Sequence, residues 1–145
     1  MTPLDVIKGR ARWCVVEGDA LDVLRGMPDG SVDAVVTDPP YDTHTHTKAR
    51  TKRGGVPVDA PIPFDPLVSV EWCVDALRVA RRWALAFCSM EMIGAYAAAS
   101  GASWMRAGFW RKHSPMPQLS GDRPGTGGES IAIMHRPGRR RWNGG

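Results

Sequence analysis

Four consecutive residues, Asp38-Pro39-Pro40-Tyr41, could act on a flat, weakly nucleophilic amine, and they follow the apolar run Val35-Val36-Thr37. An amine attached to an aromatic ring is a poor nucleophile because its lone pair is delocalised into the ring. A carboxylate that accepts one amine hydrogen helps to localise that pair, and we assign this role to Asp38. Proline restricts φ and has no N–H donor, so the carbonyl of Pro39 is expected to accept the second hydrogen from a stiff loop to which Pro40 also belongs.

Tyr41 adds an aromatic face beside these acceptors. The exocyclic amine of a nucleobase is out of reach inside a duplex, so the base must first be swung out of the stack, and a ring offsets part of the lost stacking. The alternative is a simple turn after a strand, since Asp-Pro and Pro-Pro are common in turns. The combination of acceptor, rigid carbonyl and ring favours chemistry on a base.

Predicted strands alternate with predicted helices around this group. Short apolar, β-rich runs predict strands at residues 12–17, 32–37, 83–88, 105–110 and 131–135. The strand at 32–37 is nearly all apolar, as expected for a buried parallel strand. Strands that alternate with helices predict a parallel, doubly wound sheet, whose ligands gather at the carboxyl ends of the strands.

Helices are expected at residues 21–25, from Asp65-Pro66 onward, and at 91–100, where Gly101 ends the last of them. Asp65-Pro66 supplies a cap and a first-turn proline. The helix that follows is expected to turn one apolar face to the core and to place arginines at its negative pole. The apolar residues are Leu67, Val70, Val74 and Leu77, and the arginines are Arg78, Arg81 and Arg82.

The chain resembles the S-adenosylmethionine (SAM)-dependent DNA amino-methyltransferases of the Asp-Pro-Pro-Tyr type, in particular their phage-like members. The segments that carry the resemblance are Gly18-Asp19-Ala20-Leu21, Asp38-Pro39-Pro40-Tyr41, residues 78–83, Trp110-Arg111-Lys112, Gly121-Asp122-Arg123-Pro124 and Glu129-Ser130-Ile131. The resemblance implies methyl transfer from SAM to the exocyclic amine of a flipped base in DNA, as in restriction–modification systems. Asp at position 38 is typical of the adenine enzymes, and cytosine remains an alternative.

The resemblance also implies a cofactor site at Gly18 and Asp19, beside the adenine end of SAM. The sequence alone is equally compatible with Asp19 as the cap of the helix at 21–25. Family members with an early Asp-Pro-Pro-Tyr carry a glycine-rich cofactor loop near the C-terminus. The cluster Gly125-Thr126-Gly127-Gly128 follows no apolar strand, so it is expected to be a surface turn rather than that loop.

We therefore expect a single partial catalytic domain over residues 1–145, with an incomplete Rossmann-like class I methyltransferase sheet. In the family's strand order, the strands of the cofactor loop lie between the strands at 12–17 and 32–37. Without them, the strand at 12–17 is expected to be displaced or to pair directly with the strand at 32–37. We therefore expect either a truncated enzyme or one that is completed by a separate polypeptide carrying the glycine-rich loop.

Basic side chains are expected to hold the phosphates that flank the target base. Four of them lie in the long polar segment 42–64, which is expected to be a flexible loop, and two more lie between Trp110 and Glu129. These candidates are Lys48, Arg50, Lys52, Arg53, Lys112 and Arg123. The alternatives are a solvated loop and a plain salt bridge between Asp122 and Arg123.

Composition restricts the other functional classes. A net charge of +4 suits a polyanionic partner, and 43% hydrophobic residues suffice for one core. The three cysteines form no CxxC pair, and His44 and His46 have no evident third ligand, so neither a disulfide nor a metal is expected. We take the protein to be cytoplasmic.

Besides the enzyme, a catalytically inactive DNA-binding remnant remains open. Methylation of protein glutamine or RNA is less favoured, because those relatives carry Asn at the position of Asp38.

Overall fold

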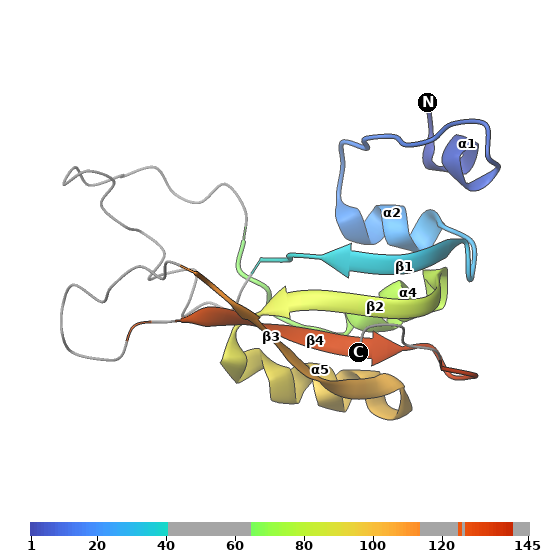
Figure 1. Ribbon diagram of the computed structural model, residues 1–145. Coiled ribbons are helices and arrows are strands. Elements are labelled where there is room, and N and C mark those ends of the chain that lie inside the picture. The colour runs from blue at the N-terminus through green and yellow to red at the C-terminus, as the bar shows by residue number, and fades with distance from the viewer. Residues whose placement is uncertain (41–64, 114–124, 126, 141–145) are drawn as a thin grey trace, which may run out of the picture.

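The structure is a computed structural model that describes residues 1–40, 65–113, 125 and 127–140 (Figure 1). In chain order its elements are α1 (Pro3–Ile7), α2 (Ala20–Gly26), β1 (Val32–Thr37), α4 (Trp72–Val79), β2 (Ala80–Cys88), the 3-10 turn η1 (Met90–Met92), α5 (Ile93–Ser100), the 3-10 turn η2 (Gly101–Ser103), β3 (Trp104–Arg111) and β4 (Gly128–His135). The predicted strands at 32–37, 83–88, 105–110 and 131–135 and the helices at 21–25 and 91–100 are thereby confirmed.

The sheet has the strand order β1-β2-β4-β3 and is mixed, so the expectation of a wholly parallel sheet is wrong. The β1 and β2 strands run parallel, as two strands joined through a crossover do, whereas β4 is antiparallel to both β2 and β3. Arg111 at the end of β3 pairs with Gly128 at the start of β4. The chain therefore returns at the same end of the sheet, which reverses its direction.

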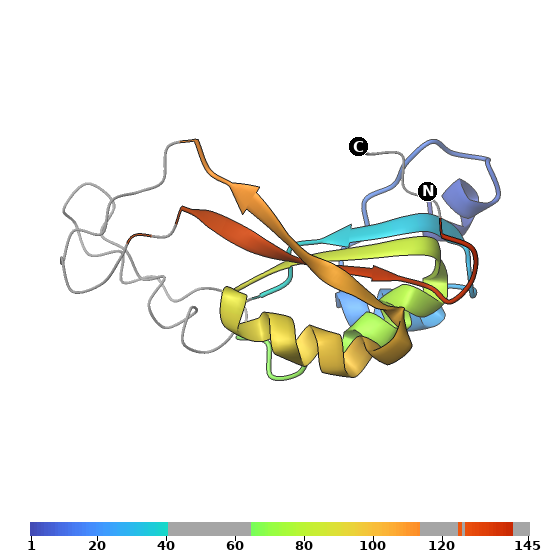
Figure 2. The same cartoon turned by 60° about the horizontal axis from the view of Figure 1, so that its bottom comes forward.

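The core lies between the sheet and the helices α4 and α5, which cover the same face (Figure 2). Small side chains on this face, among them Ala84, Ala86 and Ala132, are almost fully buried and let the helices approach the strands closely. The helices contribute Cys73, Ala76, Leu77 and Tyr96. This layer fixes β1 and β2 side by side and thereby positions their carboxyl ends.

The opposite side of the sheet carries larger apolar residues that are only partly buried or exposed. We call this surface the open face, and it consists of Val36 on β1, Trp83, Leu85 and Phe87 on β2, and Ile131 and Ile133 on β4. Val36 is 68% exposed, so the expectation of a buried β1 is wrong. The reason is that β1 is an edge strand with a neighbour on one side only, and Val36 points to the face that α4 and α5 do not cover.

The segment at residues 12–17 is not a strand, contrary to expectation. A strand needs a neighbour for its backbone N–H and C=O groups, and no described strand pairs with this segment. Its apolar side chains are left in solvent, with Trp13 70% and Val15 84% exposed. Of the two expected arrangements, displacement from β1 is therefore the one that the structure contains.

The helix expected from Asp65-Pro66 begins later, at Trp72. Leu67 and Val70 pack against the core from an irregular segment, and the Ser69 hydroxyl accepts a hydrogen bond from the Glu71 N–H at 3.2 Å in a local turn. Side-chain to backbone bonds of this kind compete with helix formation. Val74, which the sequence pattern placed in the core, is exposed, because Cys73, Ala76 and Leu77 form the buried face of α4.

Candidate active site at the carboxyl end of β1

Asp38 directly follows β1 and is exposed at the carboxyl end of the sheet. In the parallel ladder the last pair is Thr37 with Ala86, so the next residue, Asp38, lies at the level of Phe87 on β2. Pro39 and Pro40 follow with half-buried side chains. Tyr41 lies outside the described residues. The structure thus presents the predicted acid and both prolines at the edge where ligands of α/β sheets bind.

Two aromatic rings lie at the same end of the open face. Phe87 and Trp110 have ring centroids 5.9 Å apart with planes tilted by 59°. Trp110 comes from the end of β3 and is 56% exposed. Sequence reasoning did not assign a role to Phe87. The sequence signal was its position at the end of the apolar run of β2, and its level beside Asp38 follows only from the strand pairing.

Gly128 holds the ends of β3 and β4 together by close approach. A Cβ atom at this position would lie 2.3 Å from the Trp110 carbonyl oxygen and 2.4 Å from Cζ of Phe109. Gly128 is buried and begins β4, so the expectation that it belongs to a surface turn is wrong. Any side chain here would force the strand ends apart, so glycine permits the close approach of β4 to the backbone of Trp110.

Asp19 caps α2, the structural alternative that the sequence left open. Its Oδ1 atom accepts hydrogen bonds from the N–H groups of Leu21 at 2.8 Å and Asp22 at 3.2 Å. Gly18 precedes it with φ at 149°, a conformation that residues with side chains rarely adopt. The local structure thereby explains both residues, and a cofactor contact by Gly18 or Asp19 stays a prediction.

Arg78 connects α2 to α4. Its guanidinium donates to the carbonyl oxygens of Leu24 at 2.7 Å and Met27 at 2.8 Å, at the C-terminal end of α2. The hydrogen bond and ion pair with Asp29 raise the pKa of Arg78, and Asp75 adds to the effect. Arg78 was expected to stabilise the negative, C-terminal end of its own helix. Its side chain instead reaches the C-terminal end of α2. Arg81 and Arg82 belong to β2.

The basic candidates are only partly described. Lys112 forms an ion pair with Glu129 across the ends of β3 and β4. The other five, Lys48, Arg50, Lys52, Arg53 and Arg123, lie outside the described residues, as do His44 and His46. Within the described part of the chain, no group of three metal-ligating side chains comes together. No helix there is long and apolar enough to cross a membrane.

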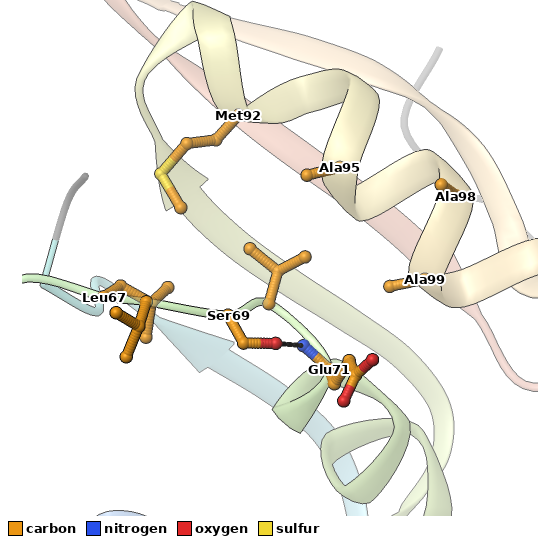
Figure 3. A pocket seen from close by; sticks show the side chains of 9 residues that line it. Leu67, Ser69, Glu71, Met92, Ala95, Ala98 and Ala99 are labelled. Atoms are coloured by element: carbon orange, nitrogen blue, oxygen red, sulfur yellow. Dashed lines mark hydrogen bonds between the residues drawn. The ribbon is translucent and has the colours of Figure 1, made fainter. Parts of the chain in front are cut away.

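A groove of about 570 Å³ lies between the segment that precedes α4 and helix α5 (Figure 3). Leu67 lies across it from Met92, Ala95 and Ala99. Val70 also lines it. Its lining is mostly apolar, and neither Asp38 nor the prolines contribute to it. This groove is therefore separate from the end of the sheet that the sequence singled out.

No protein-family model matches the chain, and no curated protein matches its sequence. Among solved structures, the chain is similar to the one described as "crystal structure of M1.HpyAVI-SAM complex", with a TM-score of 0.54 and 16% sequence identity. The alignment covers 90% of this chain and 60% of that chain, so the chain spans less than two thirds of the neighbour's length. At this identity the likeness shows the fold alone, a Rossmann-like α/β fold, here with a mixed sheet.

Proposed function

We propose that this chain is the catalytic-loop part of a SAM-dependent DNA methyltransferase specific for adenine. The observation that carries the proposal is the position of Asp38, Pro39 and Pro40 at the carboxyl end of β1, at the level of Phe87. The likeness in fold to a protein solved with SAM supports the same conclusion. A restriction–modification or phage setting agrees with the resemblance of the motifs.

Asp38 and the Pro39 carbonyl act on the target amine in this proposal. Each accepts one amine hydrogen, which localises the nitrogen lone pair and stabilises the positive charge that develops on nitrogen. Asp38 lies in an exposed loop, so the proton released after transfer can pass to water. SAM supplies the electrophilic methyl group, whose bond to sulfur breaks as the bond to nitrogen forms.

Aromatic residues hold the base outside the duplex. Tyr41 stacks on one face of it, and the exposed ring of Trp110, braced by Phe87, provides a second surface at the same end of the sheet. Lys112 and Arg123, with Lys48, Arg50, Lys52 and Arg53, neutralise the neighbouring phosphates. Lys112 must leave or share Glu129 to do so, since the two side chains pair in the free protein.

The described residues hold only part of a SAM site. Gly18 and Asp19 are the candidates for contact with the adenine end of the cofactor, and one Asp19 oxygen already caps α2. The outer edge of β1 has no neighbouring strand among the described residues. In this proposal the glycine-rich loop and the ribose contacts come from polypeptide outside the described residues, in the same protein or in a separate one.

A DNA-binding remnant without transfer activity is the second candidate function. The observation that favours it is the displaced segment at 12–17, which leaves the sheet unpaired beside β1, where a cofactor would lie. Such a chain would retain the acid, the prolines and the rings, and bind DNA without transferring a methyl group.

The experiment measures transfer of labelled methyl groups from SAM to unmethylated DNA, by the chain alone and together with the products of its flanking reading frames. Asp38→Ala is expected to lower the rate at least on the order of a hundredfold, as loss of a general acid–base group does. Asp33→Ala is the matched control, because Asp33 is an exposed acid of β1 that pairs with Arg81. Chromatography of the digested DNA then distinguishes methyladenine from methylcytosine.

Two results contradict the proposal. Binding to DNA without transfer in every combination supports the remnant instead. Transfer that is equally sensitive to Asp38→Ala and Asp33→Ala shows that the acid after β1 has no special role.

A further inference from the structure

Several arginines gather at the end of the sheet that lies opposite Asp38. The strands β1 and β2 run toward Asp38, whereas β4 is antiparallel to β2 and ends where β2 begins (Figure 1). Arg82 lies near the start of β2, and Arg136 follows the last residue of β4. We call the group formed by Arg82, Arg136, Arg139 and Arg140 the basic end.

The backbone brings these side chains together. The Arg136 N–H donates a hydrogen bond to the Arg82 carbonyl oxygen at 2.8 Å, so the two residues are neighbours across the end of the β2–β4 pair. At most about 14 Å of chain separates Arg136 from Arg139 and Arg140. The Arg82, Arg139 and Arg140 side chains are exposed, and that of Arg136 is half-buried. Their positive charges are therefore concentrated on a small surface.

The acids near the basic end are paired with other arginines. Asp33 pairs with Arg81, and Asp29 and Asp75 both pair with Arg78. None of the four arginines of the basic end forms an ion pair with a carboxylate among the residues that the structure describes. Like charges at neighbouring positions of paired strands repel. A bound polyanion would therefore stabilise this arrangement.

The chemistry of the basic end favours phosphate. The planar guanidinium group presents a fork of N–H donors that matches two phosphate oxygens. Basic clusters that bind anionic lipids lie on amphipathic helices or beside membrane-spanning ones. Here Arg82 belongs to a strand, and the other three follow β4 in an irregular segment. A nucleic-acid backbone, with its regular rows of phosphates, is the polyanion that such a surface fits best.

The basic end is too far from Asp38 to contact the target base. Along β2, Arg82 lies about 17 Å from Phe87, which is at the level of Asp38, at about 3.3 Å per residue. One base pair of duplex DNA rises about 3.4 Å. A phosphate at the basic end is therefore at least about five base pairs away from the target base.

We propose that the basic end binds the phosphate backbone of duplex DNA at least about five base pairs from the target base. Its partner rests on the proposed function, to which it adds a second contact that holds the flanking duplex. Contacts to phosphate fix position and carry no sequence information directly. The basic end accordingly contributes to affinity and its salt dependence, and not to the choice of site.

The test titrates a labelled duplex of about 30 base pairs with the full chain at several salt concentrations. Arg82→Gln is expected to lower the slope of log affinity against log salt by about 1, because each phosphate contact contributes about 0.9. The double change Arg139→Gln with Arg140→Gln is expected to lower it by about 2 and to weaken binding at low salt at least about tenfold. Arg106→Gln is the matched control, because Arg106 is also an exposed strand arginine, but on β3. It is expected to leave the slope unchanged.

Footprinting tests the position of the contact. One mismatched adenine at the centre of the duplex gives the chain a preferred site, because a mismatched base is swung out at the lowest cost. The basic-end variants are expected to lose protection at least about five base pairs from this adenine and to retain it beside the adenine. Loss beside the adenine alone would contradict the proposed position.

Circular dichroism is expected to show that all variants retain the fold, because the replaced side chains are exposed. The proposal is wrong if the basic-end variants keep the slope of the unchanged chain, or if Arg106→Gln lowers it as much as Arg82→Gln. It is also wrong if these variants bind DNA normally and lose binding to phosphatidylserine vesicles or to polyglutamate instead. Methyl transfer is not read in this test. A chain with the expected slopes that transfers no methyl group would contradict the proposed function alone.

Discussion

The Arg78 guanidinium donates a hydrogen bond to the Leu24 carbonyl oxygen at 2.7 Å, across 54 residues of sequence. Leu24 lies in the last turn of α2, where a cation is favourable because the helix carboxyl end is the negative pole. Arg78 is part of α4, which packs beneath β1 and β2. This contact therefore holds the helix that begins after Asp19 to the layer that supports Asp38.

Replacing Arg78 by Met is expected to lower the midpoint of urea unfolding, because α2 loses its bonds to α4. Arg81→Met is the control: Arg81 also bonds a carbonyl and a carboxylate, those of Gly30 and Asp33, but its side chain is more exposed. Exposed pairs contribute little, so the Arg78 change is expected to have the larger effect. Equal shifts for both variants would contradict the connecting role of Arg78.

Gly128→Ala is expected to destabilise the protein by about 1–3 kcal/mol, because the added Cβ meets the backbone and ring of β3. Gly94→Ala is expected to stabilise it by about 0.5–1 kcal/mol, because Gly94 lies in α5 with open space where the Cβ would stand. Thermal and chemical unfolding of both variants measure the difference. A neutral Gly128→Ala would show that β3 and β4 are not held at this distance.

Trp110→Ala is expected to weaken binding of a single-stranded oligonucleotide by about 1–3 kcal/mol, the range for loss of one stacked base. Phe109→Ala is the comparison, because Phe109 is similarly exposed on β3 but alternates to the opposite face. Fluorescence anisotropy with a labelled oligonucleotide measures both. The same loss for Phe109 and Trp110 would indicate a general effect of the strand end rather than stacking at the open face.

Glu129→Gln is expected to tighten DNA binding and steepen its dependence on salt, because Lys112 loses its partner and becomes free to contact a phosphate. Lys112→Gln is expected to have the opposite effect. Titrations at several salt concentrations give the slope for each variant. If Glu129→Gln leaves the slope unchanged, Lys112 does not contact DNA.

Thiol chemistry tests the burial of the core. Burial raises the pKa of Cys73 and Cys88 from the ordinary 9.0 to about 11. At pH 8 both thiols are neutral, so iodoacetamide is expected to modify the half-exposed Cys14 first, as mass spectrometry of peptides would show.

The same two buried thiols predict a pH dependence of stability. As the pH rises from about 9 to about 11, Cys73 and Cys88 ionise first in the unfolded chain. Stability is therefore expected to fall across this range, and a constant unfolding midpoint would contradict it.

Local signals in the sequence were enough to identify the strand before Asp38, the strand that ends at Cys88 and the helix that ends at Gly101. These features depend on short apolar runs, caps and glycine, which act over a few residues. The same kind of signal misplaced the start of α4, because Asp65-Pro66 has the pattern of a helix start. The helix begins later because Ser69 forms a local turn and Val70 packs against the core from an irregular segment.

The sequence by itself therefore determined the acid and the prolines at the carboxyl end of a strand, and with them the chemistry that they can perform. Only the tertiary structure decided that β4 runs antiparallel, that β1 lies at an edge with Val36 in solvent, and that Phe87 meets Trp110. The physical reason is that direction, edge position and ring contacts depend on the pairing of strands far apart in the chain, which no local pattern encodes.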